Sequence, residues 1–197
     1  MPSAYITETG EISTNSHYFI TTNSKVGITQ NIEFSIGNIF ITNIFSSLTY
    51  SRRISNSFTG ALSILGNYSI LGDYQGADQF NGWGVLPRVT FGDSSKNTTI
   101  GFVGFQLPFF QGFLYGGYFG SQKKISERFT IAGESIGLTL DGHNILLLTN
   151  VILNYTRNRN ENWSFGVILL SENDPTINII NNSDILPFPY IGIQRKF

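Results

Sequence analysis

Few residues in this sequence could carry out catalysis. The chain has two histidines, His17 and His143, and no cysteine among its 197 residues. A serine–histidine hydrolase needs its nucleophile and its base within hydrogen-bond reach, yet no serine is expected beside His143 on a paired strand. The surrounding residues, Asp141-Gly-His-Asn144, are instead typical of a hairpin turn. We therefore predict that the protein is not an enzyme, with a lipid hydrolase as the alternative.

The sequence also lacks the motifs that bind metals and cofactors. It contains no phosphate loop, zinc motif or calcium loop, and the absence of cysteine excludes disulfides and thiolate metal sites. Asp73, Asp78 and Asp174 fall in predicted loops, where exposed carboxylates are usually only solvated. We therefore predict that the protein has no metal site and no cofactor.

The composition favours a sheet whose outer surface meets hydrocarbon. Charged residues make up 13% of the chain and aromatic residues 14%, and the charged share is low for a soluble domain. The 12 basic and 13 acidic residues nearly balance, so no nucleic-acid-binding surface is indicated. No apolar run approaches the ~20 residues of a transmembrane helix. A membrane-spanning form of this chain must therefore use strands, because only helices and closed barrels satisfy the backbone in lipid.

Polar and apolar residues alternate along the whole chain, and helical periodicity is hard to find. We predict about twelve strands in one domain over residues 1–197, or roughly ten to fourteen given the uncertainty of such boundaries. An even number is expected of single-chain bacterial barrels. The predicted strands cover Glu11–Thr21, Ser24–Thr29, Asn31–Phe40, Asn43–Ser51, Ser57–Leu71, Trp83–Gly92, Thr98–Gln106, Gly112–Gly120, Arg128–Leu140, Asn144–Thr156, Asn162–Leu170 and Tyr190–Phe197.

The connections between these strands differ in length. Those after every second strand are short and polar, at residues 30–31, 52–56, 93–97, 121–127 and 157–162. The two long connections, Gly72–Gly82 and Ser171–Asp184, follow the other strands. Short turns at one end and longer loops at the other are typical of outer-membrane barrels, whose termini lie on the short-turn, periplasmic side.

The strand at Ser57–Leu71 shows most clearly how its two faces differ. One face carries Phe58, Gly60, Leu62, Ile64, Gly66, Tyr68 and Ile70, and the other carries Thr59, Ala61, Ser63, Leu65, Asn67 and Ser69. We interpret the large apolar face as outward and the small polar face as facing the lumen. A soluble sandwich would show the same alternation with its apolar face inward, so the alternation alone leaves both architectures open.

Aromatic residues flank the short turns on the apolar face. We interpret them as a belt at one membrane interface, where amphipathic rings are enriched. The predicted interface residues are Tyr50, Phe58, Phe119, Phe129, Tyr155, Trp163 and Phe197. The alternative is that these rings cap the core of a sandwich.

Isolated charges occupy the polar phase of several predicted strands. A Lys or Arg facing lipid near the midplane would cost about 2–4 kcal/mol, so the inward position is cheaper. We therefore predict that the lumen is lined by Lys25, Glu33, Arg88, Glu134 and His17. The favoured interpretation is that these ions pair with one another and fill a narrow interior. The alternative is that they line a pore and tune its selectivity.

The last eight residues, Tyr190-Ile-Gly-Ile-Gln-Arg-Lys-Phe197, end the chain on an aromatic residue. They resemble the C-terminal assembly signal of bacterial outer-membrane barrels in Tyr190, Gly192 and the terminal Phe197. Arg195 departs from that pattern, in which this position is usually apolar. The resemblance implies that the outer-membrane assembly machinery recognises this strand.

A wider resemblance covers most of the chain. The sequence is similar to a group of uncharacterised outer-membrane barrel proteins of Gram-negative bacteria, which have no established activity. The similar stretches are Pro2-Ser-Ala4, Thr9-Gly-Glu11, Val26–Asn31, Ser126–Phe129 with Glu134, and Pro187–Phe197. The first residues lack the basic start and apolar core of a secretory signal, so we expect a signal to have been removed or the chain to start within a longer precursor.

Taken together, these features predict an all-β, antiparallel, up-and-down transmembrane barrel in the bacterial outer membrane. The predicted function is that of a narrow porin-like channel or a structural barrel, with the lipid bilayer as its partner. Two alternatives stay open. One is a soluble periplasmic β-barrel or sandwich that binds a hydrophobic ligand, and the other is a lipid-modifying barrel enzyme.

Overall fold

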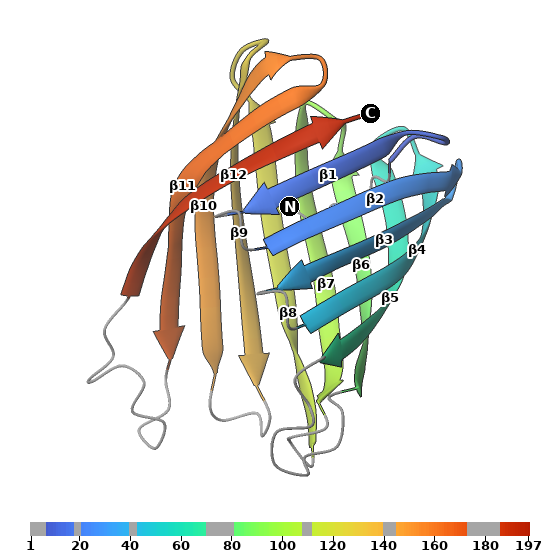
Figure 1. Cartoon of the computed structure of the whole chain (residues 1–197), viewed down its shortest axis with the longest axis vertical. Helices are drawn as coiled ribbons and strands as arrows, with labels where there is room; N and C mark the ends of the chain where they lie inside the picture. The colour runs from blue at the N-terminus through green and yellow to red at the C-terminus, as the bar shows by residue number, and fades with distance from the viewer. Residues whose placement is uncertain are drawn as a thin grey trace.

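The computed structural model describes residues 7–17, 21–39, 43–69, 81–107, 112–139, 145–172 and 186–197. Within these ranges the chain forms twelve β-strands (Figure 1). They are β1 (Ile12–His17), β2 (Thr21–Thr29), β3 (Ile32–Ile39), β4 (Asn43–Ser55), β5 (Phe58–Ser69), β6 (Asn81–Gly92), β7 (Lys96–Leu107), β8 (Gly112–Lys124), β9 (Phe129–Thr139), β10 (Leu146–Asn158), β11 (Glu161–Glu172) and β12 (Leu186–Lys196). No helix in the described part of the chain could span a bilayer.

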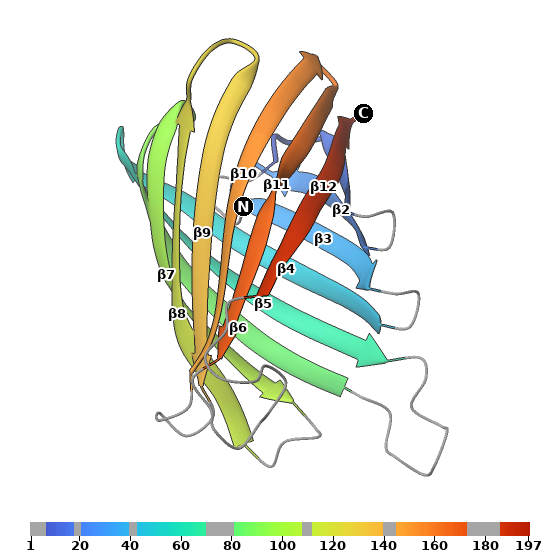
Figure 2. The ribbon, with the colours of Figure 1, turned by 90° about the vertical axis from the view of Figure 1, so that its left-hand side faces the viewer.

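The strands form a closed antiparallel barrel in which each strand pairs with its neighbours in the sequence. β1 closes the sheet by pairing with β12, from Ser13 opposite Lys196 to His17 opposite Gly192. Figures 1 and 2 show β1–β5 crossing the strands of the far wall at a steep angle, as tilted strands on opposite sides of a barrel do. The predicted up-and-down barrel of twelve strands is therefore confirmed.

Five tight turns join the strands at one end of the barrel, called the turn end, and the opposite end is called the loop end. The turns comprise residues 30–31, 56–57, 93–95, 125–128 and 159–160. Each follows an even-numbered strand, as predicted. The start of β1 and the end of β12 also lie at the turn end, where the Phe197 amide donates to the Ile12 carbonyl at 2.8 Å. The predicted loops Gly72–Gly82 and Ser171–Asp184 lie almost entirely outside the described residues.

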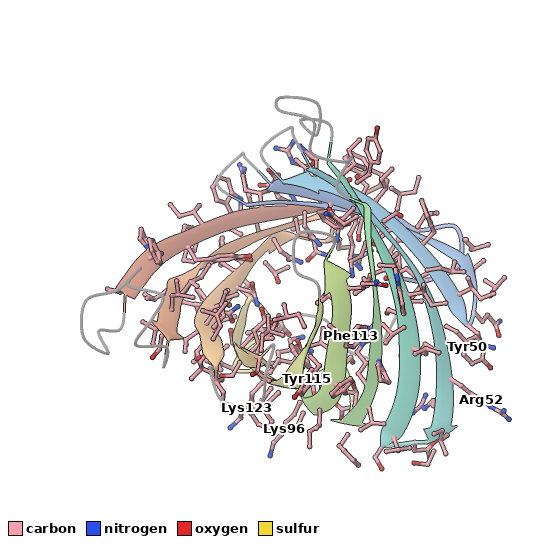
Figure 3. The ribbon with its side chains drawn as sticks, turned by 90° about the horizontal axis from the view of Figure 1, so that it is seen from below. Tyr50, Arg52, Lys96, Phe113, Tyr115 and Lys123 are labelled. Atoms are coloured by element: carbon pink, nitrogen blue, oxygen red, sulfur yellow. The ribbon has the colours of Figure 1, made fainter. Side chains whose placement is uncertain are left out.

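Several strands extend further towards the turn end than the sequence predicted. β4 runs to Ser55 and β8 to Lys124, each four residues beyond the predicted end. The charged residues there suggested a turn, yet Arg52 and Lys123 stay in the ladder, and their side chains project away from the barrel (Figure 3). Their charges are compatible with a strand because they lie on its exposed outer face.

β12 also begins earlier than predicted, at Leu186 and not at Tyr190. The added residues include Pro187 and Pro189, and proline has no amide hydrogen to donate to a ladder. The Phe197 amide points to β1, and in an antiparallel strand every second residue points the same way. The two prolines therefore face the β1 side, beyond Gly192, where the described pairing with β1 ends. Their missing hydrogens cost no bond in the described ladder.

The turn between β6 and β7 shows how one acidic residue organises a connection. The Asp93 Oδ1 atom accepts hydrogen bonds from the Ser95 hydroxyl at 2.6 Å, the Ser95 amide at 2.7 Å and the Lys96 amide at 3.0 Å. These bonds, the one from the Ser95 hydroxyl above all, hold the pKa of the Asp93 carboxyl below its usual range. The carboxylate therefore stays charged and keeps the turn closed.

Replacing Gly92 by alanine should destabilise the barrel by about 2 kcal/mol, the cost of a strained backbone conformation. Gly92 has φ of +107°, which side-chain-bearing residues rarely adopt, and a Cβ there would lie 2.1 Å from the Lys96 carbonyl oxygen. Urea denaturation of the protein folded in detergent micelles measures the loss. The matched control is Gly117→Ala, since a Cβ at Gly117 meets nothing within 4 Å. Equal stability of the two variants would contradict the strain argument.

Candidate functional site

The two faces of the barrel wall differ sharply in chemistry. On β5, Leu62 and Ile64 are 46% and 56% exposed on the outside, whereas Thr59 and Ser63 are 4% and 2% exposed on the inside. The face assignment made from the sequence of this strand is therefore confirmed. Exposed large apolar residues continue around the outer face, for example at Leu48, Ile100 and Val151. The interior is the candidate functional site, because the polar side chains gather there.

Aromatic side chains occupy the outer face at the turn end. The structure places all the predicted interface residues on the outer face, namely Tyr50, Phe58, Phe119, Phe129, Tyr155, Trp163 and Phe197. Five of them lie within four residues of a turn or of the chain end, whereas Tyr50 and Phe119 lie near the middle of β4 and β8, because these two strands extend beyond their predicted ends. Neighbouring rings contact one another. The ring centroids of Phe58 and Phe91 are 5.1 Å apart, and those of Phe129 and Tyr155 are 5.3 Å apart. We call this set of residues the turn-end belt.

A second group of outward aromatic residues lies at the loop end and was missed in the sequence. This loop-end belt consists of Tyr68, Trp83, Phe113 and Tyr115. The Trp83 and Phe113 rings lie 6.1 Å apart, and the Trp83 indole Nε1 donates to the Gln106 side-chain oxygen at 2.5 Å. Tyr68 and Trp83 flank the predicted long loop Gly72–Gly82, a signal that could have revealed these two.

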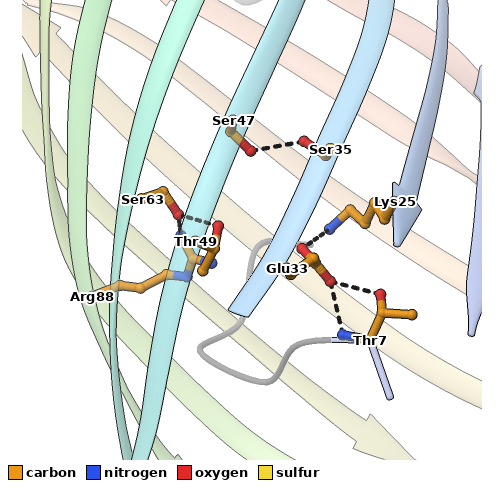
Figure 4. A network of polar contacts seen from close by, with 8 residues as sticks. All are labelled: Thr7, Lys25, Glu33, Ser35, Ser47, Thr49, Ser63 and Arg88. Atoms are coloured by element: carbon orange, nitrogen blue, oxygen red, sulfur yellow. Dashed lines mark hydrogen bonds and ion pairs between the residues drawn. The ribbon is translucent and has the colours of Figure 1, made fainter. Parts of the chain in front are cut away.

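Inside the barrel, Lys25 and Glu33 lie on the paired strands β2 and β3. The Lys25 Nζ atom is 3.5 Å from Glu33 Oε1, and the Glu33 side chain is only 6% exposed (Figure 4). The second oxygen, Oε2, accepts hydrogen bonds from the Thr7 amide at 2.8 Å and the Thr7 hydroxyl at 2.6 Å. The structure thus brings the two predicted charges together and adds a third partner from the N-terminal segment.

The N-terminal segment, residues 7–10, runs along the inner face of β2. The Gly10 amide donates to the Gly27 carbonyl at 2.9 Å. A Cβ at the buried Gly27 would lie 2.1 Å from the Glu8 carbonyl oxygen, so only glycine leaves room for the segment. Nothing in the alternation pattern predicted that this segment would enter the barrel.

Arg88 belongs to a separate chain of hydrogen bonds on the same wall. It is 7% exposed, and its Nη1 donates to the Ser63 hydroxyl at 2.7 Å. The Ser63 hydroxyl in turn lies 2.7 Å from that of Thr49, and a parallel hydroxyl pair joins Ser35 and Ser47 at 2.7 Å (Figure 4). The inner face of β3–β6 is therefore lined by polar side chains that are hydrogen-bonded to one another.

Glu134, the other predicted lumen carboxylate, lies on β9 and has neutral partners. Its Oε2 accepts a hydrogen bond from the Tyr118 hydroxyl at 3.2 Å, and its Oε1 accepts one from Asn150 Nδ2 at 2.5 Å. None of the ion pairs formed among the described residues includes Glu134. The sequence placed Arg88 and Glu134 on the same face, and the structure gives them different partners.

The interior changes from polar to apolar towards the loop end. The lumenal face predicted from the sequence was small and polar throughout, so this apolar region is a correction. The change is clearest on β9–β12, where aligned inward positions form a continuous surface that we call the apolar inner wall. It consists of Leu138, Leu146, Ile136, Leu148, Leu170, Ile168 and Phe188. Although these residues face inward, Leu146 and Phe188 are 38% and 47% exposed, so the wall keeps open apolar surface.

The remaining candidates fall partly outside the described residues. The backbone of His17 pairs with Gly192, but its side chain lies outside the described residues. His143 and the acidic residues Asp73, Asp78 and Asp174 lie outside them entirely. Within the described ranges, no cluster of three or more acidic or histidine side chains could hold a metal ion.

The closing strand carries the three predicted assembly-signal residues. Gly192 is buried opposite His17, Tyr190 is half-buried on the inner face, and Phe197 is 75% exposed on the outer face. Arg195, which departs from the signal pattern, lies on the outer face with its Nε atom 3.8 Å from Glu161 Oε2. An acidic partner at the rim explains why a charge is tolerated at this position.

Comparisons with known proteins support the fold. No protein-family model matches the sequence, and no curated protein matches it either. Among solved structures, the barrel is similar to the NanC porin, with a TM-score of 0.65 and 13% sequence identity over 95% of this chain and 98% of that one. It is also similar to the KdgM porin, with a TM-score of 0.62 and 11% identity over 95% and 99%. This chain therefore shares the twelve-stranded barrel fold of these porins.

Proposed function

We propose that the protein is an integral outer-membrane barrel that forms a narrow, porin-like channel. The observation that carries the proposal is a closed barrel whose outer face is apolar, with outward aromatic residues towards both ends, and whose interior is polar and charged at the turn end. Lipid-facing barrels have this arrangement, because the outer face meets hydrocarbon and the rings lie at headgroup level. In this proposal the lipid bilayer and the assembly machinery are the partners.

The similarity to solved porins adds to this proposal. One of the similar structures is the KdgM porin in complex with disordered oligogalacturonate. A channel in this chain would be narrow at the turn end, because Glu33, Thr90 and Thr99 are buried there at 4%, 0% and 0% exposure. We therefore expect small unitary currents.

The exposed outer face argues against the soluble alternative. A soluble β-barrel that binds a hydrophobic ligand would turn its large apolar residues inward. Here Ile64, Phe119 and Val151 are each more than half exposed on the outside. Such a surface would be expected to aggregate in water.

The test is to fold the denatured chain in lipid vesicles and record currents across planar bilayers. We expect a strand-rich species with heat-modifiable gel mobility only in the presence of lipid or detergent, and stepwise currents after insertion. A soluble, strand-rich monomer in plain buffer would overturn the membrane assignment. Insertion without any current would overturn the channel and leave a structural barrel.

Replacing Phe197 by alanine should lower the yield of folded protein in membranes several-fold. The side chain projects outward at the turn end and completes the closing strand, where we propose that the assembly machinery recognises it. Quantification of the heat-modifiable band in outer membranes measures the yield. Phe197→Tyr is the matched control and should keep the yield, since the ring is retained. An unchanged yield for the alanine variant would count against a role in assembly.

A further inference from the structure

Glu134, on the inner face of β9, is a carboxylate without a cationic partner among the described residues. Lys25 lies beside Glu33, and at the turn-end rim Lys196 lies 2.7 Å from Glu11. Glu134 instead accepts hydrogen bonds from Tyr118 and Asn150, which are both neutral donors. Hydrogen bonds from neutral groups hold the carboxylate in place, but they leave its negative charge available to a ligand.

This carboxylate lies at the edge of the apolar inner wall. Glu134 precedes Ile136 by two residues on β9, so their side chains leave the same face about 7 Å apart. In the neighbouring strand, Asn150 lies opposite Glu134 and Leu148 lies opposite Ile136. In β11, Ile168 lies opposite Asn150, and in β12, Phe188 lies opposite Ile168. The charge and the apolar surface therefore form one continuous patch on the inner face of β9–β12.

Such a patch has the chemistry of a ligand site. Sites for small molecules are largely apolar, with a few polar groups that fix the orientation of the ligand. Phe188 and Leu146 face inward and still expose 47% and 38% of their surface. Burying that surface favours an apolar ligand body, and the unpaired carboxylate favours a positively charged end.

We propose that this patch binds small amphipathic organic cations, with the amine at Glu134 and the apolar body on the apolar inner wall. The inference rests on the channel proposed above, because the ligand would be a solute that enters the lumen from the loop end. Anionic solutes are disfavoured at this site, since they would bring a like charge to Glu134. Strongly hydrated neutral solutes gain little from the apolar wall.

The test compares three probes that share one apolar body and differ in charge. The probes are 2-phenylethylamine, 2-phenylethanol and phenylacetate, titrated at neutral pH into the full chain folded in lipid nanodiscs. We expect the amine to bind at least about tenfold more tightly than the alcohol, and the acid to bind weakest. Equal binding of the amine and the alcohol would overturn the proposal. This comparison needs no variant, so it does not depend on a mutant that folds.

Two variants then locate the site. Glu134→Gln keeps the size and should reduce the affinity for the amine about tenfold, with little change for the alcohol. Leu148→Ser should weaken the amine and the alcohol alike by about tenfold. The matched control is Leu65→Ser, an inward leucine on β5 in the opposite wall, which should change neither. Binding of the amine that is unaffected by Glu134→Gln would overturn the assignment.

The outcomes separate this inference from the channel itself. If the protein passed currents in planar bilayers but bound the three probes with equal affinity, the cation site would be overturned and the channel would stand. Binding of the amine that depends on Glu134, in a protein that passes no current, would overturn the channel and leave the site.

Discussion

Replacing Glu33 by alanine is expected to lower the free energy of unfolding by about 2–3 kcal/mol. Removing one partner of a buried ion pair typically costs 3–5 kcal/mol, because the other charge is left uncompensated. The expected loss is smaller here because the Lys25 side chain keeps 30% exposure and can reach water. The change also removes the acceptor of both Thr7 hydrogen bonds. Urea denaturation of the protein folded in lipid vesicles measures the effect.

Two comparisons make this expectation specific. Glu11→Ala breaks the pair with Lys196 at the rim, where the side chains are 23% and 42% exposed, and should cost at most about 1 kcal/mol. The double variant Lys25→Met with Glu33→Leu removes both charges and should recover much of the stability. If Glu33→Ala lowered the free energy of unfolding no more than Glu11→Ala, the contacts of Glu33 in the interior would not contribute more to stability than the pair at the rim.

Replacing Val151 by arginine is expected to destabilise the barrel in lipid by about 2–4 kcal/mol. Val151 lies in the middle of β10 on the outer face and is 51% exposed. An arginine on the lipid face costs this much near the bilayer midplane and about 0–1 kcal/mol near the interfaces. In a water-soluble barrel the same change would place a charge on a solvated surface, at little cost. The free energy of folding into vesicles therefore tests the membrane orientation directly.

Leu147→Arg is the matched control for Val151→Arg. Leu147 lies on the same strand and the same face, four residues nearer the loop end, and is 41% exposed. The two sites are about 13 Å apart along the strand, so the control lies closer to the loop-end belt and should cost less. Equal costs at both positions would mean that the outer face does not cross a bilayer in the proposed orientation.

The two expected effects concern opposite faces of the same wall. Val151 tests whether the outer face meets lipid, and Glu33 tests how the interior is held together. Because the side chains of neighbouring residues leave a strand on opposite sides, one barrel wall presents both environments. A protein that lost stability only with Glu33→Ala would have the proposed interior without the proposed surroundings.

The sequence by itself determined the architecture. A period of two is imposed by the pleated backbone, so alternation of large apolar and small polar residues was enough to predict about twelve antiparallel strands. The low share of charged residues and the aromatic residues beside the short turns then favoured an outward position for the apolar face of Ser57–Leu71. The short polar turns were also predicted, since their residue types specify local conformation. The predicted strand Tyr190–Phe197 began too late, because the effect of Pro187 and Pro189 on a strand depends on whether a partner strand lies on the side that their nitrogen atoms face.

The interior depended on the tertiary structure. Lys25 and Glu33 lie in adjacent strands and could be paired from the hairpin alone, but Thr7 reaches them only because the N-terminal segment folds back over Gly27. Arg88 and Glu134 shared a predicted face and took different partners, Ser63 in one case and Tyr118 with Asn150 in the other. The alternation of polar and apolar residues indicates on which face of the barrel wall a side chain lies. Its neighbours there are set by the register of all the strands around the closed sheet, which no local pattern contains.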